Sequence, residues 1–157
     1  MRSEGMAEGR VENRVGYQMK RAQHALRVEM DKALRDIGMT TPQYAALSVL
    51  EATPGLSGVE LARRSFVAPQ TMNAILANLE AAGLAARRPH PEHGRILQAY
   101  LTEVGEESLA RAHGAVGAVE RRMLEGLSRD DRHRLLEALR SCADTLEVSA
   151  EEAIAGA

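Results

Sequence analysis

The sequence predicts a mainly α-helical protein with a small two-stranded β-wing, in which a winged helix-turn-helix domain lies between additional N- and C-terminal helices. Three observations support this fold class. Apolar residues recur in steps of three and four along most of the 157-residue chain. Helix-capping residues and glycines separate these stretches from one another. Between two of the stretches lie two short strand-like segments, joined by a loop that contains proline and glycine.

Two helices are predicted in the first third of the chain. Residues 11–37 place apolar side chains at helical spacing, and Gly38 is positioned to end that helix. A helix of this length is too long for a small domain to cover by itself. The second helix covers residues 41–52, with Thr41 as its N-cap and Pro42 at the first helical position.

Two shorter helices follow, separated by the tight turn "SFVA". Ser57 and Glu60 match a capping box, in which each side chain satisfies a backbone N–H group of the other residue. The next helix covers residues 69–83, and Gly83 ends it. Its N-cap is Ala68, which has no side-chain acceptor. Four apolar residues of this helix fall on one face: Met72, Ile75, Leu76 and Leu79.

The remaining elements are a hairpin and two long helices. The segments "LAARR" and "RILQAYL" read as strands around "PHPEHG", whose prolines and glycine favour a loop. Thr102 is positioned to cap the next helix, and Ser128 to cap the last one. We expect the chain beyond Ser149 to fray.

Composition and charge restrict the possible classes of protein. The chain lacks an apolar run of membrane-spanning length, and its first ten residues lack the apolar stretch of a secretory signal. Cys142 is the single cysteine, which agrees with a reducing compartment. These features predict a soluble cytoplasmic protein without membrane contacts. The formal net charge is only −2, but residues 61–95 carry five arginines and two glutamates, whereas the last fifteen residues are acidic.

The outer face of the helix at residues 69–83 is unusual, because its side chains are small or uncharged where a solvated helix normally carries Glu and Lys. The residues of this face are Pro69, Gln70, Thr71, Asn73, Ala74, Ala77 and Asn78. Gln and Asn can make paired hydrogen bonds to adenine, Thr can reach a base or a phosphate, and alanine allows close approach or contact with a thymine methyl group. The pattern indicates a recognition helix that enters the major groove of double-stranded DNA.

Basic residues flank this helix in the sequence. They are Arg63, Arg64, Arg87, Arg88 and Arg95. Arginines at such positions neutralise phosphates and orient the helix. Successive strand residues point to opposite sides, so we expect about half of the first four to contact phosphate. We expect Arg95, in the wing, to reach the neighbouring backbone or the minor groove, where a narrow groove attracts a guanidinium group.

At these residues the sequence resembles the multiple antibiotic resistance regulator (MarR) family of bacterial transcription factors. The segments that carry the resemblance are "GLSGVELARRSFVAPQTMNAILANLEAAGLAARR", Arg95 in the wing and "YLTEVGEESL" at the start of the next helix. Turn, recognition helix, Gly-Leu end, wing and Leu-Thr helix start all match at the same spacing. The resemblance extends more weakly over about residues 11–147.

The resemblance implies a homodimer whose first and last helices interlock, and a repressor that a small aromatic or anionic ligand releases from a palindromic operator. Residues 69–73 would begin the reading helix. The expected domains are a disordered N-terminus (1–10), dimerisation helices (11–37 and 102–147), the winged domain (38–101) and a frayed acidic tail (148–157). Two copies of the recognition helix would lie about 34–36 Å apart, one turn of DNA.

Two positions depart from the family pattern. The wing commonly has Asp two residues before its arginine, and here that residue is His93, so the support that orients Arg95 is absent or depends on pH. The usual Ser or Thr before "PQT" is Ala68, which removes a phosphate contact as well as a cap.

The sequence predicts no cofactor and no metal site. The histidines are His24, His90, His93, His113 and His133. The second and third are three residues apart in the wing but lack further ligands nearby, and a zinc site formed by the other three is not visible in a sequence. Cys142 is in helical phase with Leu139 and Leu146, which predicts a buried small side chain rather than an oxidant sensor. Tyr17 and Tyr44 either border a ligand pocket or pack in the core.

Two other functions compete with DNA binding. The chain has no nucleotide-binding, zinc-protease or nucleophile-elbow motif and no plausible carboxylate pair, so we predict that it is not an enzyme. The alternative is a helical protein-interaction module that uses the winged domain without DNA; it predicts no salt-sensitive binding to duplex. Scattered aromatic residues disfavour single-stranded nucleic acid.

Overall fold

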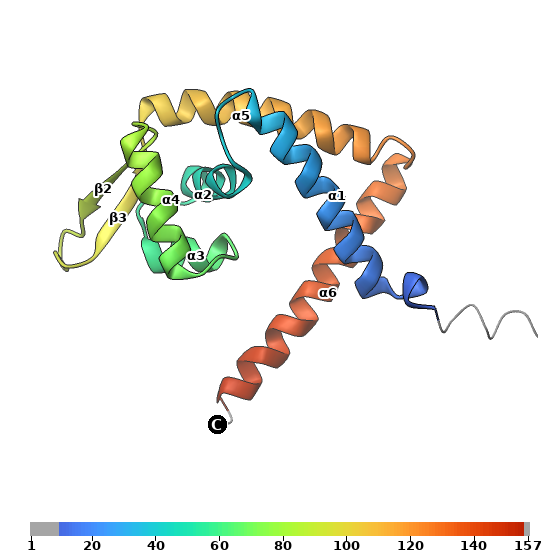
Figure 1. The fold of residues 1–157 in the computed structure, drawn as a ribbon. Coiled ribbons are helices and arrows are strands. Elements are labelled where there is room, and N and C mark those ends of the chain that lie inside the picture. Colours follow the sequence, from blue (N-terminus) through green and yellow to red (C-terminus); the bar gives the residue numbers. More distant parts are fainter. Residues whose placement is uncertain (1–9, 156–157) are drawn as a thin grey trace, which may run out of the picture. The chain divides into compact units, whose positions relative to one another are not determined.

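A computed structural model describes the backbone of residues 10–155 and the side chains of residues 10–147 (Figure 1). The chain forms two compact units, of which the first ends at Glu120 and the second begins at Arg121. Of the predicted disordered N-terminus, residues 1–9 lie outside the described part, and Arg10 is exposed in a bend.

The first long helix, α1, spans Val15–Arg35. A 3-10 turn at Val11–Asn13 precedes it, and extended backbone at Arg14 (ψ 133°) separates the two. The helix predicted over residues 11–37 therefore begins about one turn later than expected. Gly38 ends this region with a φ of +74°, a left-handed conformation that glycine adopts without steric cost.

Helix α2 spans Thr41–Ala52, and its N-cap is Thr40 rather than the predicted Thr41. The Thr40 hydroxyl accepts from the Gln43 N–H at 3.3 Å, and the Gln43 side chain accepts from the Thr40 N–H at 3.0 Å. This reciprocal bond needs a partner three residues along the chain, and Gln43 supplies it only to Thr40. The hydroxyl of Thr41 instead donates to Asp31 of α1, which lowers the pKa of that carboxyl group.

Helices α3 (Gly58–Arg64) and α4 (Pro69–Ala81) form the helix-turn-helix, as predicted. Ser57 and Glu60 make the predicted capping box at the start of α3. In the turn between the helices Phe66 adopts a left-handed conformation, with a φ of +57°. Such a residue reverses the chain directly after a helix, so that α4 can pack against α3.

The sheet has three antiparallel strands in the order β1-β3-β2, whereas the sequence predicted two. Strands β2 (Ala85–Pro89) and β3 (Leu97–Leu101) are the predicted hairpin. The additional strand β1 contains only Leu56–Ser57, and Leu56 pairs with Ala99. A strand of two residues has no alternating pattern to detect, and its partner lies far away in the sequence.

Helix α5 (Glu103–Met123) begins directly after the hairpin and packs closely against the turn that follows α4. The Thr102 hydroxyl accepts from the Gly105 N–H at 3.0 Å and donates to the carbonyl of Gly83. A Cβ atom on Gly105 would lie only 2.0 Å from the carbonyl oxygen of Leu84. This close contact explains why the residue three positions after the Thr102 cap is a glycine.

The hydrophobic core of the first unit draws on five helices. Its largest fully buried side chains are Leu34, Leu47, Leu50, Leu61, Met72, Leu76, Leu79 and Leu109. Three of these belong to α4, which is therefore held from one side by α2, α3 and the sheet. The opposite side of α4 is left exposed.

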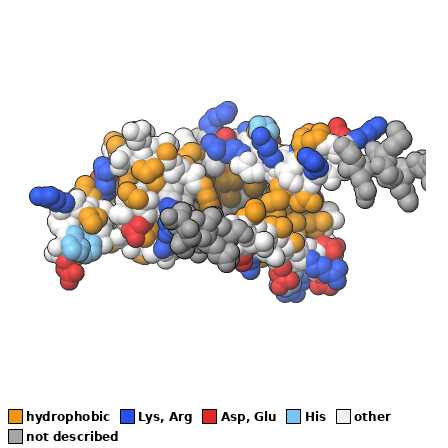
Figure 2. All heavy atoms as spheres, turned by 90° about the horizontal axis from the view of Figure 1, so that it is seen from below, with side chains coloured by type: hydrophobic (Ala, Val, Ile, Leu, Met, Phe, Trp, Pro, Cys, Tyr) orange, Lys and Arg blue, Asp and Glu red, His pale blue; other side chains and the backbone are white. Residues whose placement is uncertain are grey.

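The second unit contains the last helix, α6, which spans Arg129–Ala155 after the cap formed by Ser128 and Asp131. Every described side chain of α6 is exposed. Figure 2 shows that hydrophobic side chains gather on this face of the molecule. The exposed leucines of α6 are Leu135, Leu136, Leu139 and Leu146. The prediction that Cys142 is buried is therefore wrong for the single chain, in which the apolar stripe of α6 stays uncovered.

The backbone of α6 remains helical to Ala155, beyond the point near Ser149 where we predicted fraying. Alanine and glutamate dominate this end of the chain, and both have high helix propensity. Within the described residues, no helix is long and apolar enough to cross a membrane.

Candidate nucleic-acid interface

Helix α4 exposes the face that the sequence assigns to base recognition. Its apolar stripe is buried: Met72, Leu76 and Leu79 are inaccessible, and Ile75 is 9% exposed. Because α-helical residues turn by about 100° each, the positions opposite this stripe are Gln70, Ala74 and Ala77, and all are exposed. The prediction of a core stripe and an uncharged outer face on this helix is confirmed.

Three other predicted contact residues lie on the flanks of α4. Thr71 and Asn78 are exposed on the side of the helix that borders a cavity next to α1 and α2. Asn73 lies on the opposite flank and faces Gly58 of α3. If Gly58 had a Cβ atom, the Oδ1 atom of Asn73 would be 3.5 Å from it. Pro69, also exposed, begins the helix. Apart from the partly exposed Glu80, the accessible surface of α4 thus consists mainly of amide, hydroxyl and aliphatic groups.

The start of α4 lacks the side-chain cap that most helices have. Ala68 is the N-cap and makes no side-chain hydrogen bond, as predicted. The first N–H groups of α4 therefore remain available, and Phe66 in the preceding turn is 91% exposed. An uncapped helix N-terminus attracts anions such as phosphate.

The two arginines of α3 are exposed at its C-terminal end. Arg64 donates to the hydroxyl of Thr53 at 3.0 Å, so one of its N–H groups is engaged within the protein. Arg63 is also exposed. Nearby, the Ser57 backbone and side chain donate to Glu60 and lower the pKa of its carboxyl group.

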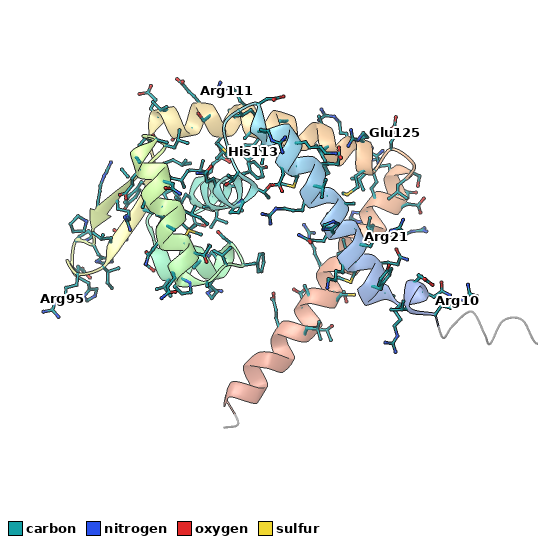
Figure 3. The ribbon with its side chains drawn as sticks, in the orientation of Figure 1. Arg10, Arg21, Arg95, Arg111, His113 and Glu125 are labelled. Atoms are coloured by element: carbon teal, nitrogen blue, oxygen red, sulfur yellow. The ribbon has the colours of Figure 1, made fainter. Side chains whose placement is uncertain are left out.

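The wing arginines are in three different environments. Arg88 stacks on the ring of Tyr100, with 5.1 Å between its Cζ atom and the ring centroid. Arg95 lies at the tip of the wing and points away from the rest of the domain (Figure 3). Arg87 is partly buried and makes an ion pair within the protein.

The ion pair of Arg87 connects the wing to the recognition helix. Its guanidinium donates to Glu80 of α4 at 2.6 Å, and the two side chains are only 25% and 32% exposed. This hydrogen bond lowers the pKa of Glu80 and raises the pKa of Arg87. The Nε atom of Arg87 is buried without a partner among the described residues. Sequence spacing does not indicate this pair, because it joins a helix to a strand.

The remaining histidine candidates are distributed over several elements. Among the described residues, no three His, Cys, Asp or Glu side chains form a group that could hold a metal ion. His113 of α5 instead bridges two side chains of α2, with its Nδ1 atom 2.9 Å from the Tyr44 hydroxyl and its Nε2 atom 2.8 Å from Glu51. Tyr44 also packs against the core, as one of the two predicted alternatives stated.

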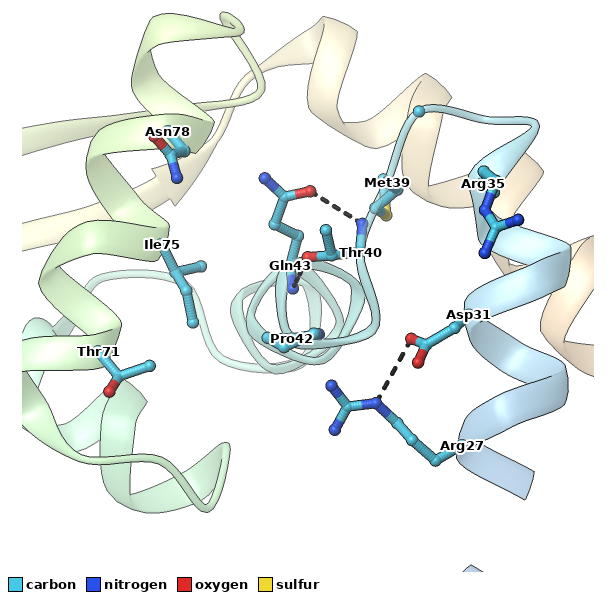
Figure 4. Close-up of a pocket in the computed structure, with 11 residues that line it drawn as sticks. Arg27, Asp31, Arg35, Met39, Thr40, Pro42, Gln43, Thr71, Ile75 and Asn78 are labelled. Atoms are coloured by element: carbon cyan, nitrogen blue, oxygen red, sulfur yellow. Dashed lines mark hydrogen bonds and ion pairs between the residues drawn. The ribbon is translucent and has the colours of Figure 1, made fainter. Parts of the chain in front are cut away.

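A cavity of about 670 Å³ lies between α1, the start of α2 and α4 (Figure 4). Arg27, Asp31 and Arg35 of α1 line one wall. Thr71 and Asn78 of α4 line the other, so a molecule in this cavity would touch the recognition helix. No pattern in the sequence predicts this cavity, because its walls come from segments that are far apart in the chain.

A helix-turn-helix with an exposed, uncharged recognition helix beside an arginine-bearing wing defines a class of protein: the winged helix-turn-helix DNA-binding proteins. Comparison with known proteins gives the family. A sequence profile of the MarR family matches residues 37–96. The chain is 40% identical over 130 residues to the HTH-type transcriptional repressor Rv2887 of Mycobacterium tuberculosis. This alignment covers 81% of this chain and 94% of that protein. The chain belongs to the MarR family of transcriptional regulators.

Solved structures agree with this assignment. The transcriptional repressor CouR bound to a 23-mer DNA duplex is 32% identical, with a TM-score of 0.79 over 87% of this chain and 96% of CouR. Rv2887 of Mycobacterium tuberculosis in complex with salicylic acid is 37% identical, with a TM-score of 0.69 over 82% of this chain and 96% of that protein.

Proposed function

We propose that this chain is a homodimeric transcriptional repressor, not an enzyme, that binds a palindromic double-stranded operator and leaves it when a small aromatic or anionic ligand binds. The observation that carries the proposal is the exposed, uncharged face of α4. Its amides and methyl groups match the edges of base pairs in a major groove, which is wide enough for one helix. The similarity to a repressor bound to a DNA duplex supports the same mode of binding.

The proposed contacts have different roles. Base edges are read by Gln70, Asn73, Ala74 and Ala77, with Pro69, Thr71 and Asn78 at the margins of the groove. Arg63, Arg64 and Arg88 are exposed and would neutralise phosphates of the DNA backbone. Arg95, at the tip of the wing, would reach the adjacent minor groove. We assign Arg87 a positioning role instead, because Glu80 already holds its guanidinium group.

A second copy of the chain is the proposed partner in the homodimer. The leucines of α6 that the single chain leaves exposed are between 40% and 73% accessible. Residues 11–37 and 102–147 are the proposed dimerisation segments, and residues 38–101 the DNA-binding domain. Burial of these leucines between two copies would remove the apolar surface from water.

The cavity beside α4 is the proposed site of the ligand. Two arginines, Arg27 and Arg35, offer positive charge on one wall, and Asp31 partly offsets it. Complexes of Rv2887 with salicylic acid and with p-aminosalicylic acid support a small aromatic acid as the class of ligand. A ligand in contact with Thr71 and Asn78 would compete with the DNA for the flank of α4 or displace this helix.

DNA binding is tested by the salt dependence of affinity for a duplex from the promoter upstream of the protein's own gene. Replacement of Arg95 by Ala should weaken binding and reduce the slope of log affinity against log salt by about one unit. Arg111 on α5, away from the wing tip, is the matched control, and its replacement by Ala should leave the slope unchanged (Figure 3). Absence of salt-sensitive duplex binding would refute the proposal and favour the protein-interaction alternative.

Ligand release is tested by adding salicylate to the protein–DNA complex in a mobility-shift assay. We expect salicylate to release the wild-type protein from the duplex. Replacement of Arg35 by Gln should require more salicylate for release, with little change in DNA affinity, because Arg35 lines the cavity from α1. If the variant and the wild type respond equally to salicylate, the cavity is not the site of the ligand.

A further inference from the structure

The tip of the wing is a short loop between β2 and β3 that carries Arg95. Two backbone hydrogen bonds close it: the His90 N–H donates to the carbonyl of Ile96 at 2.8 Å, and the Ile96 N–H donates to the carbonyl of His93 at 2.8 Å. Arg95 lies directly within the segment that the second bond closes. The direction of its side chain therefore depends on how this loop is held.

The imidazole of His90 provides the third restraint of the loop. Its Nδ1 atom accepts from the N–H of Glu92 at 3.1 Å and from the N–H of His93 at 3.2 Å. A backbone N–H group can only donate, so the ring can fill this role only while Nδ1 carries no proton. The proton of the neutral ring must then be on Nε2.

This arrangement is the one that Asp and Asn side chains usually make in turns, where an oxygen accepts from backbone N–H groups two or three residues further along the chain. An Asp carboxylate keeps that role down to about pH 4, and an Asn amide keeps it at any pH. A histidine loses it between about pH 8 and pH 5, where imidazole groups take up a proton. Protonation places a hydrogen atom on Nδ1, opposite two other N–H groups.

The charged groups around His90 come mainly from the same hairpin. Glu92 and His93 follow it in the loop, and the rings of His90 and His93 lie 5.2 Å apart with 34° between their planes. Arg95 extends into solvent. On α4, the helix that packs against β2, the one acidic residue is Glu80, which is already paired with Arg87. Two protonated rings at this distance would repel each other and so work against the closed loop.

We propose that His90 is a positioning residue for DNA binding. While Nδ1 of His90 carries no proton, the neutral ring orders the tip of the wing and so holds Arg95 toward the DNA. Protonation of Nδ1 breaks the hydrogen bonds to the loop, so that Arg95 is no longer held in place. This inference rests on the proposed function, because it assumes that Arg95 contacts DNA. It adds that the contribution of Arg95 to affinity depends on pH.

The first experiment needs no DNA. In amide NMR spectra of the full-length protein, the N–H resonances of Glu92 and His93 should shift with pH at the same midpoint as the ring of His90. In the His90→Asn variant, which retains an acceptor that does not titrate, the Glu92 amide should no longer follow such a midpoint, whereas the His93 amide still responds to its own ring. In His93→Asn, the amides of Glu92 and residue 93 should both keep the midpoint of the His90 ring. Amides that do not follow the His90 ring would overturn the proposal at its structural step.

The second experiment measures affinity for the promoter duplex in four proteins: wild type, Arg95→Ala, His90→Asn and the double variant. In the wild-type background, the loss caused by Arg95→Ala should fall from about tenfold at pH 7.5 to about twofold at pH 5.5. In the His90→Asn background the loss should be the same at both pH values. Protonated histidines also attract phosphates directly. That effect is present both with and without Arg95→Ala in the same background, so it cancels in the ratio of the two affinities at a given pH.

The matched control is His93→Asn, which removes the neighbouring imidazole and leaves His90 in place. The pH dependence of the Arg95 contribution should persist in this variant. If it persists equally in His90→Asn, the proposal is wrong, even when the amides titrate as expected. A protein that binds no duplex at any pH would refute the proposed function and the role of His90 in binding, whereas the amide titration would still establish whether His90 orders the loop.

Discussion

The ion pair between Glu80 and Arg87 leads to the prediction that the structure specifies most fully. Replacement of Glu80 by Gln keeps the size of the side chain and removes its charge. The guanidinium group of Arg87 would then be partly buried without a counter-charge, and its Nε atom is already buried without a partner among the described residues. Loss of this pair should therefore destabilise the fold and loosen β2 from α4.

The magnitude follows from the geometry of the pair. Hydrogen bonds to charged groups contribute about 1.5–3 kcal/mol, and fully exposed ion pairs about 0–1 kcal/mol. The Arg87 and Glu80 side chains are 25% and 32% exposed, at a separation of 2.6 Å, which places the pair between these limits. We expect the Glu80→Gln variant to lose about 1–2 kcal/mol, which corresponds to a decrease in Tm of roughly 2–8 °C for a chain of this length.

Thermal unfolding followed by circular dichroism measures this loss. The control is Lys32→Gln, because Lys32 donates to Glu29 at a similar distance, 2.7 Å, but its side chain is 60% exposed. The control should change stability by less than about 0.5 kcal/mol. Equal stabilities of Glu80→Gln and the wild type would refute the reasoning, because the pair would then contribute no more than an exposed one.

The pH dependence of this loss has a defined sign. In the folded protein the pKa of Glu80 lies below its ordinary value, because Arg87 donates to the carboxylate. The stabilisation is therefore fully present above the ordinary glutamate pKa of about 4.3, and it disappears as the pH falls through the lowered value. The difference in stability between wild type and Glu80→Gln should thus be constant near neutral pH and shrink in acid.

Two further predictions concern the ends of helices. Replacement of Gly105 by Ala should lower stability by several kcal/mol or prevent folding, because the new Cβ atom would lie 2.0 Å from the Leu84 carbonyl oxygen. Replacement of Ala68 by Ser should raise stability by about 0.5–1 kcal/mol, because the hydroxyl can accept from a free N–H group at the start of α4. Both effects can be measured by urea unfolding.

Each of these variants has a control in the same chain. Gly114 lies in the same helix as Gly105, but a Cβ atom added there would meet no other atom within 4 Å outside its own stretch of helix, so Gly114→Ala should stabilise the protein by up to about 1 kcal/mol. If Gly105→Ala behaves like Gly114→Ala, the close contact with Leu84 does not exist in solution. For the cap, Ala68→Val is the control, since valine has no acceptor; equal stabilities of the Ser and Val variants would contradict a role for the hydroxyl group.

The sequence predicted those features that are encoded by near neighbours. The stripe of Met72, Ile75, Leu76 and Leu79 predicted both the helix and its buried face, because helical period and burial are the same signal. The Ser57 capping box and the role of Gly83 as the left-handed glycine just beyond α4 were also correct, since each depends on residues within one helical turn, although the helix itself ends at Ala81 rather than at residue 83. The error at Thr41 arose at this same scale, because two adjacent threonines can both serve as caps and the partner three residues later decides between them.

The sequence did not predict interactions between distant segments. Strand β1 depends on Leu56 meeting Ala99, and the bridge through His113 depends on α5 meeting α2. The prediction that Cys142 is buried was wrong, because helical phase indicates which face of α6 is apolar but not whether the same chain covers that face. Spacing likewise could not separate Arg87 from Arg88, although one is paired internally and the other stacks on an aromatic ring.

By itself, the sequence determined the order of helices, the turn before the recognition helix and the uncharged character of that helix, because backbone propensity, capping and periodicity act over a few residues. Only the tertiary structure decided which arginines are free, where a cavity meets α4 and what holds the tip of the wing. These depend on pairs of side chains brought together by the burial of the core. Such pairings follow from the packing of whole elements, and no local pattern in the chain specifies them.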